Sequence, residues 1–276
     1  MNVPILVYHR VPKEAAQRGP WALPLGDFRE QMAYLARNNI AVCALDAFWE
    51  AYRSHQPLGQ KSVVLTFDDG YAATCENVEG VLDQYNYPAT LFLTTNVIGQ
   101  RDPLGARNEG VLTWGQVRAL HRLRVEAHSV SHPRLSQLDA HHVRTEVSTC
   151  KVILEDALGR AVKHFAYPYG GYNHMVRGEV RNAGYESAYT AHIGPATFHD
   201  DPFQFHRILL DGRTPLDVFA RRVQSGFISR REQAAVSVRT ALFRVPWMHD
   251  LVERRNATSW MNSSMTSDSS REIRGS

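Results

Sequence analysis

Short apolar runs alternate along the chain with longer segments in which apolar residues recur at helical spacing. The runs are rich in β-branched and aromatic residues, which indicates buried strands. The predicted strands are Ile5–Tyr8, Val63–Phe67, Ala89–Thr94, Arg124–Ala127, His164–Tyr167 and Glu186–Ala191. A repeated order of strand and then helix predicts an α/β fold on a mostly parallel sheet, either open or closed into a barrel.

The predicted helices are bounded by residues that commonly start or end helices. Val143, Val147, Cys150 and Leu154, for example, form one helical stripe that stops at Gly159. The other predicted boundaries are a capping box at Thr113 and Gln116, caps at Asn173 and Thr214, Pro215 as a first helical residue, and stops at Gly184 and Gly226.

Two adjacent carboxylates, Asp68 and Asp69, directly follow the apolar run Val63–Phe67 in the stretch VVLTFDDGY. In parallel sheets and barrels, ligands gather at the carboxyl ends of the strands. We therefore expect both carboxylates to lie at a functional site on this rim. Gly70 would provide the turn that lets them reach it.

Two histidines four residues apart, His128 and His132, follow the predicted strand Arg124–Ala127. Because Pro133 suits the first turn of a helix, we expect His132 at or near a helix cap and His128 at the strand end. Two imidazoles and one carboxylate are enough to hold a catalytic divalent metal with positions left open. The alternative is an accidental spacing, since the chain has 13 histidines.

The stretch HFAYPYGGYN ends another predicted strand in Tyr-Pro-Tyr-Gly. Pro168 fixes one backbone angle and the glycines at 170 and 171 relax the next, so the amide of Tyr169 could point into the rim. A fixed amide close to a developing negative oxygen is what acyl chemistry needs. An ordinary aromatic-rich turn would look the same.

The composition limits which class of protein this can be, but it says little about the reaction that the protein would catalyse. The 276 residues carry a formal net charge of +3, which does not by itself indicate a nucleic-acid partner. Cys43, Cys75 and Cys150 are widely spaced, so neither a disulfide framework nor a thiolate zinc site is favoured. We see no signal-peptide pattern and no apolar run of membrane-spanning length, and we expect a cytoplasmic protein, although a longer exported precursor could contain the same sequence.

Three motifs, LTFDDGY, HSVSHPRL and FAYPYGGYN in that order, resemble those of the polysaccharide deacetylase family, also called the NodB-like domain or carbohydrate esterase family four. The segments ILVYHRV, LTWGQVRAL, AGYESAYT and FHRILLDG extend the similarity over roughly Val3 to Gln224. It is closest to the branch that includes poly-N-acetylglucosamine and exopolysaccharide deacetylases.

The resemblance implies a distorted (β/α) barrel of about seven parallel strands, a divalent metal that is often zinc, and a carbohydrate substrate. It assigns residues 1–228 to the deacetylase domain. Residues 229–276 are left as a C-terminal extension, which we expect to be partly helical and then disordered.

The resemblance also implies roles for individual residues. Asp69, His128 and His132 would be the metal ligands, and Asp68 would be the general base. The amide of Tyr169, together with the metal, would hold the oxyanion of the tetrahedral intermediate. The residues implied to bind substrate are Tyr71, Pro168, Tyr169 and Gly170.

Two positions depart from the family pattern. The third motif commonly carries an arginine that orients the base, but that position is Ala166 here, and Arg207 is our candidate to replace it. The family also carries a late histidine as general acid, for which His206 and His192 are the available substitutes. His9, at the end of the first predicted strand, is expected to have a hydrogen-bonding role rather than a catalytic one.

The leading hypothesis is a metal-dependent hydrolase that removes N-acetyl groups from an amino-sugar polysaccharide or its precursor during exopolysaccharide biosynthesis. A deformylase or deacetylase of a small or lipid-linked amino sugar would use the same site with a different cleft. A catalytically decayed carbohydrate-binding protein stays open because of the two departures. A phosphotransferase is a more distant alternative, since it would leave the histidine pair without a role.

Overall fold

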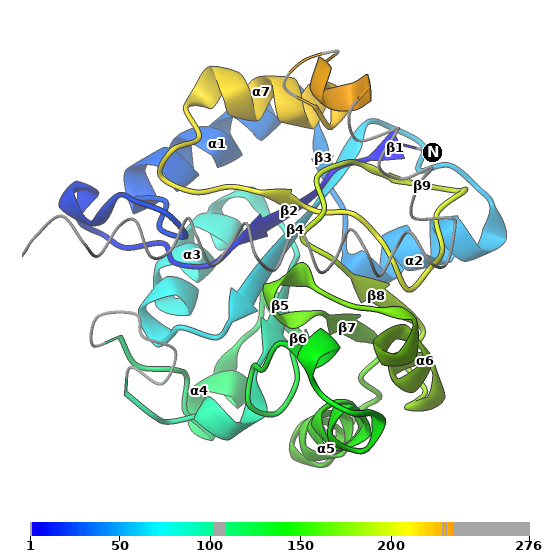
Figure 1. The fold of residues 1–276 in the computed structure, drawn as a ribbon. Helices are drawn as coiled ribbons and strands as arrows, with labels where there is room; N and C mark the ends of the chain where they lie inside the picture. The colour runs from blue at the N-terminus through cyan, green and yellow to red at the C-terminus, as the bar shows by residue number, and fades with distance from the viewer. Residues whose placement is uncertain (1, 102–108, 228, 230, 235–276) are drawn as a thin grey trace, which may run out of the picture.

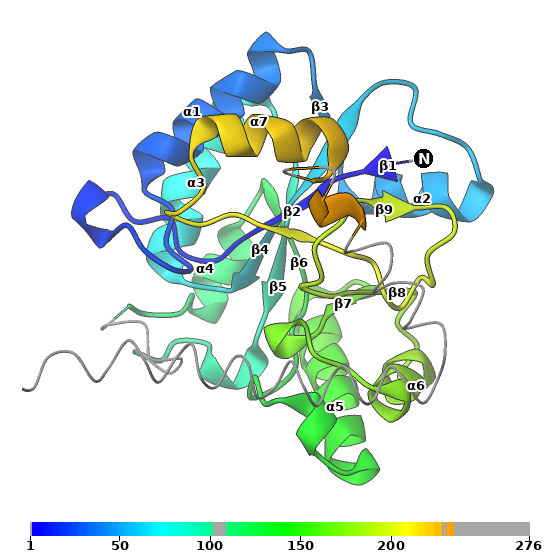
Figure 2. The ribbon, with the colours of Figure 1, turned by 45° about the horizontal axis from the view of Figure 1, so that its top comes forward.

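Seven parallel strands lie side by side in one curled sheet, with helices arranged around them, in the computed structural model (Figures 1 and 2). The structure describes residues 2–101, 109–227, 229 and 231–234. The strand order is β10-β2-β4-β5-β6-β7-β8, and every neighbouring pair is parallel. These strands are β2 (Ile5–Tyr8), β4 (Ser62–Asp69), β5 (Ala89–Leu93), β6 (Leu123–Ala127), β7 (His164–Ala166), β8 (Ser187–Tyr189) and β10 (Ile208–Leu209).

The two edges of this sheet are joined by a single segment of chain. Phe205 makes a parallel bridge to Tyr189 of β8, and three residues farther on Ile208–Leu209 pairs with β2. The sheet therefore curls into the distorted barrel of seven parallel strands that the resemblance implied, and that prediction is confirmed. Three short strands lie beside it: β3 (Ala41–Val42) pairs with β4, and β1 (Asn2–Val3) pairs with β9 (Ala196–Thr197).

The helices follow the strands in the alternation that the sequence predicted. They are α1 (Leu25–Arg37), α2 (Leu45–Ser54), α3 (Ala72–Tyr85), α4 (Trp114–Ala119), α5 (Ala140–Leu158), α6 (His174–Asn182) and α7 (Leu216–Ser225). Four short 3₁₀ turns are η1 (Ala15–Gln17), η2 (Thr95–Val97), η3 (Leu135–Gln137) and η4 (Pro168–Gly170). No helix among the residues described here is long and apolar enough to cross a bilayer.

Alternation along the strands creates two apolar cores. In β4, Leu65 and Phe67 pack outward in the larger core under the helices, whereas Val64 packs inward in a smaller one. The inner core includes Phe48 and Trp49 of α2, so this helix closes the inside of the barrel. Thr66 and Asp68 lie on the same inward face as Val64, which leads from the inner core to the rim.

Several predicted helix boundaries are confirmed, but the two at the start of α7, Thr214 as the cap and Pro215 as the first helical residue, are wrong. Thr113 and Gln116 form the capping box, Asn173 caps α6, and Gly159 and Gly226 end their helices in the left-handed region. Thr214 is not a cap, because α7 has Pro215 as its N-cap and the Thr214 hydroxyl instead accepts a hydrogen bond from the Asp211 amide. Helix α6 ends at Asn182 with Ala183 as its C-cap, just before the predicted stop at Gly184.

The expected helix start at His132 and Pro133 is also wrong. These residues lie in an irregular loop, η3 begins only at Leu135, and α5 begins at Ala140 with Asp139 as its cap. The predicted C-terminal extension from residue 229 lies almost entirely outside the described residues, so the domain boundary at residue 228 stays a prediction.

Candidate metal centre

The carboxyl end of β4 carries the two adjacent aspartates, Asp68 and Asp69, and both are buried. The turn after β4 begins at Asp69, one residue earlier than expected. Asp69 already has a φ of 75°, and Gly70 follows at 92°. A Cβ on Gly70 would lie 2.2 Å from Leu93 Cδ1, so close packing as well as φ requires glycine there. This backbone reversal breaks the strand alternation and lets both carboxylates reach the rim.

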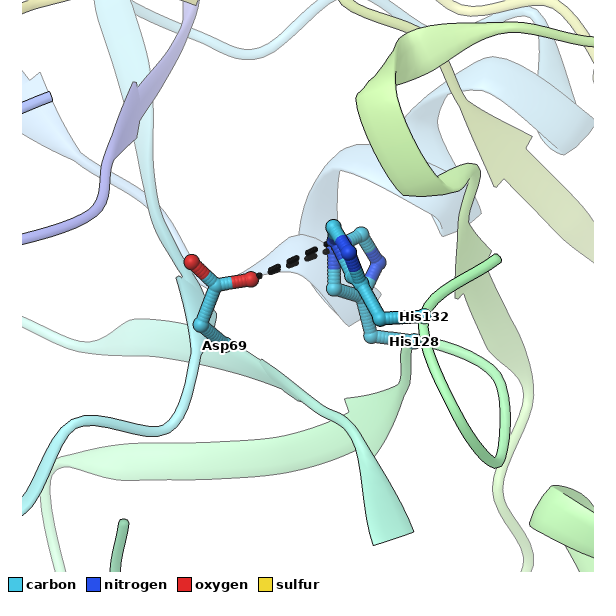
Figure 3. Close-up of side chains that lie close together, drawn as sticks. All are labelled: Asp69, His128 and His132. Carbon is cyan, nitrogen blue, oxygen red and sulfur yellow. Dashed lines mark hydrogen bonds and ion pairs between the residues drawn. The ribbon is translucent and has the colours of Figure 1, made fainter. Parts of the chain in front are cut away.

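The histidine pair lies directly opposite Asp69, as Figure 3 shows. The Oδ1 atom of Asp69 is 3.7 Å from His128 Nε2 and 3.4 Å from His132 Nε2, and the two Nε2 atoms are 3.2 Å apart. His128 follows β6, two strands from β4 in the sheet, while His132 returns over it through a loop with positive φ at Ser129 and at His132 itself. The Ser129 hydroxyl accepts the His132 amide hydrogen at 3.0 Å and closes that loop.

The His128 imidazole presents a lone pair rather than a proton to Asp69. His128 Nδ1 lies 2.8 Å from the Ala166 carbonyl, which requires a hydrogen on Nδ1 and leaves Nε2 free to bind. Burial lowers the pKa of His128 to about 4. Burial and the neighbouring His128 lower the pKa of His132 to about 3. Both rings are therefore neutral at neutral pH, which is the form that binds metal ions.

Among the described residues, one oxygen of the Asp69 carboxylate lacks a hydrogen-bond partner. Its Oδ1 atom is buried without a hydrogen bond, although the Tyr71 side chain does hydrogen bond to this carboxylate. Burial, and then the charge of Asp68, raise the pKa of Asp69 to about 8. A cation at Oδ1 would compensate this charge, and one ligand atom from each of Asp69, His128 and His132 lies within 4.8 Å of the others. The residues fit a divalent metal held by two nitrogens and one oxygen, with positions left open.

A carboxylate from α5 fixes the loop between the two histidines. Glu146 accepts hydrogen bonds from the amides of Val130 and Ser131, both at 2.9 Å, and from the Ser131 hydroxyl at 2.6 Å. Glu146 was not predicted from the sequence, because it lies in the helical pattern 18 residues from His128 and no neighbouring residue indicates what it binds. Such partners outside the ligand set commonly orient metal ligands.

Arg207 forms an ion pair with Asp68, although the two residues are 139 positions apart in the sequence. Its guanidinium donates from Nη1 and Nη2 to the two carboxylate oxygens at 2.7 and 2.8 Å, and from Nε to the Thr190 carbonyl at 2.9 Å. Burial raises the pKa of Asp68, but the Arg207 and His128 charges outweigh it and lower that pKa to about 2. Asp68 is thus held ionised and oriented by Arg207, a contact that the Ala166 side chain could not make.

A second imidazole besides that of His128 lies against Asp68, that of His9. His9 Nε2 is 3.9 Å from Asp68 Oδ2, and its ring packs edge-on against Trp21 with centroids 4.8 Å apart. Burial lowers the pKa of His9 to about 4. In the sequence, His9 directly follows β2, and β2 pairs with β4, the strand that carries Asp68. By contrast, His206 packs against Gly194 with its ring 6.0 Å from that of His192, on the other side of the strand from Arg207.

Among the four residues predicted to bind substrate, Tyr169 is the exposed one, with 48% of its surface accessible. Its ring lies 4.6 Å from the His132 ring, between centroids. Pro168 and Gly170 are buried, and a Cβ on Gly170 would meet Ala191 at 2.3 Å. Tyr71 is buried too and contacts Asp69 as described above, so only Tyr169 offers a surface to a substrate.

The arrangement of these motifs is that of a known family. Residues 55–188 match the family model described as polysaccharide deacetylase. The segment that carries the aspartate, histidine and Tyr-Pro-Tyr motifs thus belongs to the polysaccharide deacetylase family. The part of the chain that matches this family model holds Asp68, Asp69 and both histidines, whereas His9 and Arg207 lie outside it. The two residues that complete the site thus come from segments on either side of the deacetylase motifs.

Relatives in the deacetylase family cover most of this chain. The Bacillus subtilis protein YxkH, which is named for the family, is 24% identical over 225 residues, or 81% of this chain and 77% of its own. The poly-beta-1,6-N-acetyl-D-glucosamine N-deacetylase of Escherichia coli is 26% identical over 254 residues, covering 78% of this chain but only 38% of that protein. The Streptococcus pyogenes deacetylase PplD, solved in complex with acetate, has the same fold, with a TM-score of 0.72, 21% identity, and 80% and 97% of the two chains covered.

Proposed function

We propose that this protein is a metal-dependent hydrolase that removes N-acetyl groups from an amino-sugar polysaccharide, giving acetate and a free amine. The observation that carries the proposal is the pair of neighbouring carboxylates in opposite environments. Asp69 faces two neutral imidazoles with an unsatisfied oxygen, while Asp68 is held ionised by Arg207. One carboxylate is suited to a cation and the other to a proton.

Zinc is the metal that we propose, because two histidines and one carboxylate with open positions are typical of catalytic zinc sites. When bound by Asp69, His128 and His132, it would lower the pKa of a water molecule and polarise the acetamide carbonyl. The site chemistry also suits other divalent ions that accept nitrogen and oxygen ligands. Metal content therefore needs to be measured rather than assumed.

The protein's own groups account for the movement of protons. An Asp68 oxygen accepts a proton from the attacking water, whose oxygen joins the carbonyl carbon, and Arg207 keeps this carboxylate ionised until then. The proton that Asp68 accepts then passes through His9, whose Nε2 lies 3.9 Å from Asp68 Oδ2, to the nitrogen as the carbon–nitrogen bond breaks. The amide of Tyr169 would hold the developing negative oxygen. Acetate and a free amine result, with no other reactant needed.

An N-acetylglucosamine polymer made for export is the substrate class that we propose. The support is the E. coli relative, whose name specifies poly-beta-1,6-N-acetyl-D-glucosamine, and the exposed Tyr169 ring beside the metal ligands, since aromatic rings offer an apolar face with a polar tip. A deformylase of a small amino sugar would need the same site but has no separate feature in its favour.

The test is acetate release from β-1,6- and β-1,4-linked N-acetylglucosamine oligomers by the zinc-loaded protein. Asp68→Asn should lower the rate by about 10²- to 10⁴-fold and still bind metal, because it removes only the proton acceptor. His128→Ala should lose metal and activity together. As a matched control, Asp217→Asn at an exposed ion pair of α7 should behave like the wild type. A metal-loaded wild type that is no faster than Asp68→Asn on any amino-sugar polymer would overturn the proposal.

A further inference from the structure

Tyr169 is held in an unusual position beside the metal ligands. It has a φ of 58°, which non-glycine residues seldom adopt, and its ring is nevertheless about half exposed. The turn around it is fixed by the Gly170 amide, which donates to the Tyr167 carbonyl at 2.7 Å, and by the tight packing of Gly170 on Ala191. A strained residue whose side chain points outward next to His132 indicates a functional rather than a packing role.

One face of the Tyr169 ring is already occupied by a cation. The Arg134 guanidinium carbon lies 4.3 Å from the ring centroid, two residues after the metal ligand His132. Within the part of the chain that the structure describes, no carboxylate lies within ion-pair distance of Arg134. Glu146, whose carboxylate contacts this loop, accepts hydrogen bonds from Val130 and Ser131 instead. Arg10, another arginine that follows the carboxyl end of a strand, is neutralised by Glu109.

This pairing changes what the exposed ring can bind. The negative face of an aromatic ring attracts cations, including ammonium groups, as well as apolar sugar faces. Arg134 fills that cation site and adds a positive charge that is not balanced by a contacting carboxylate. The ring can still pack against a neutral sugar, but a sugar with a free ammonium group meets a like charge.

We infer that Arg134 is a specificity-determining residue, which makes the sugar-binding surface on Tyr169 accept neutral N-acetylated units and disfavour units that carry a free amine. This inference rests on the proposed function, because deacetylation itself turns a neutral acetamide into an amine that is protonated at neutral pH. The enzyme would thus bind its own product segments poorly. Deacetylated units next to the reacting sugar would slow further reaction, so the polymer would be left partly acetylated.

The experiment compares fully N-acetylated glucosamine oligomers with oligomers of equal length that already carry some free amines. In the wild type, KM should be about 3- to 5-fold lower for the fully acetylated oligomer, the size expected of partly exposed charges. Arg134→Gln should bring the two KM values together, and Arg134→Lys, which keeps the charge, should retain most of the difference. Arg37→Gln, at the exposed end of α1, removes the same charge elsewhere and should leave the ratio at the wild-type value.

Equilibrium binding separates this inference from the proposed function. Calorimetry with the zinc-loaded wild type should show tighter binding of N-acetylglucosamine oligomers than of glucosamine oligomers, and raising the salt concentration should reduce the difference. Absence of acetate release with this binding preference intact would remove the proposed function and leave the charge selection standing. Equal binding of both oligomers, or an unchanged preference in Arg134→Gln, would overturn the inference.

Discussion

Two clusters of buried and partly buried polar side chains are associated with the same barrel and differ in how fully they are hydrogen-bonded. The rim cluster is at the carboxyl ends of the strands, and the lower cluster is nearer their amino ends. The rim cluster consists of Asp68, Asp69, His128, His132 and Arg207. The lower cluster consists of Asp46, Arg124, Glu126, His164 and Ser187.

Every charged or polar member of the lower cluster has a partner. Glu126 is fully buried, and its carboxylate accepts from the amides of Lys163 and His164 at 2.7 and 2.9 Å and from Arg160 at 3.1 Å. His164 lies between Ser187 and Asp46, at 2.8 and 3.1 Å. This Ser-His-Asp order resembles a catalytic triad, but Ser187 is fully buried and donates to Tyr189, so its role is structural.

The rim cluster leaves one oxygen without a partner, Asp69 Oδ1. Burial, and then the neighbouring charge of Asp68, raise the pKa of Asp69, whereas Arg207 lowers the pKa of Asp68 despite its burial. Burial alone therefore does not distinguish a structural cluster from a functional one. The distinguishing feature is an unsatisfied group at an open strand end, where an external ion can complete it.

The largest expected effect on stability comes from the lower cluster. Glu126→Ala would leave two buried amides and the Arg160 guanidinium without their acceptor, and we expect a loss of about 3–5 kcal/mol in the free energy of unfolding. Denaturant unfolding measures it. Glu50→Ala, which breaks an exposed ion pair with Arg53, should change stability by no more than about 0.5 kcal/mol. A cost at Glu126 as small as at Glu50 would contradict the structural role.

At the rim, removal of a buried carboxylate should not lower the free energy of unfolding of the metal-free protein. Asp69→Asn removes a buried carboxylate that has an unpaired oxygen and a charged neighbour, so the metal-free variant should be as stable as the wild type or more so. Zinc at 100 times its dissociation constant should stabilise the wild type by about 2.7 kcal/mol and leave the variant almost unchanged. Thermal unfolding with and without zinc tests both statements. A variant that is strongly destabilised without metal would show that Asp69 is satisfied within the protein.

A smaller effect is expected from acid. The hydrogen bond from His164 lowers the pKa of Asp46 from its ordinary value of 3.8, with Arg124 adding to the shift. A carboxylate with a depressed folded pKa stabilises the fold above 3.8, and this contribution is lost as the pH falls from there through the folded pKa. Urea unfolding across this range should therefore show a steeper loss of stability in the wild type than in Asp46→Asn. Equal slopes would mean that the lower cluster does not depend on this charge.

Local patterns in the sequence were sufficient for most of the framework. Strand positions, the capping box at Thr113 and the left-handed ends at Gly159 and Gly226 depend on neighbours within a few residues, and these predictions are confirmed. The same reasoning failed at His132, where Pro133 suggested a helix start. There the loop follows contacts with Ser129 and Glu146 rather than local preference.

The sequence by itself determined a mostly parallel sheet with Asp68, Asp69 and His128 at strand ends, because strand-end positions follow from periodicity, and its resemblance to the deacetylase family implied the barrel and the metal ligands. Only the tertiary structure decided which groups surround them, including whether the candidate Arg207 reaches Asp68. The pairing of Arg207 with Asp68, the approach of His9 and the Arg134 cation on Tyr169 are contacts between separate loops or strand ends. They depend on how the sheet curls and on the positive φ values of individual residues, for which local patterns carry no signal.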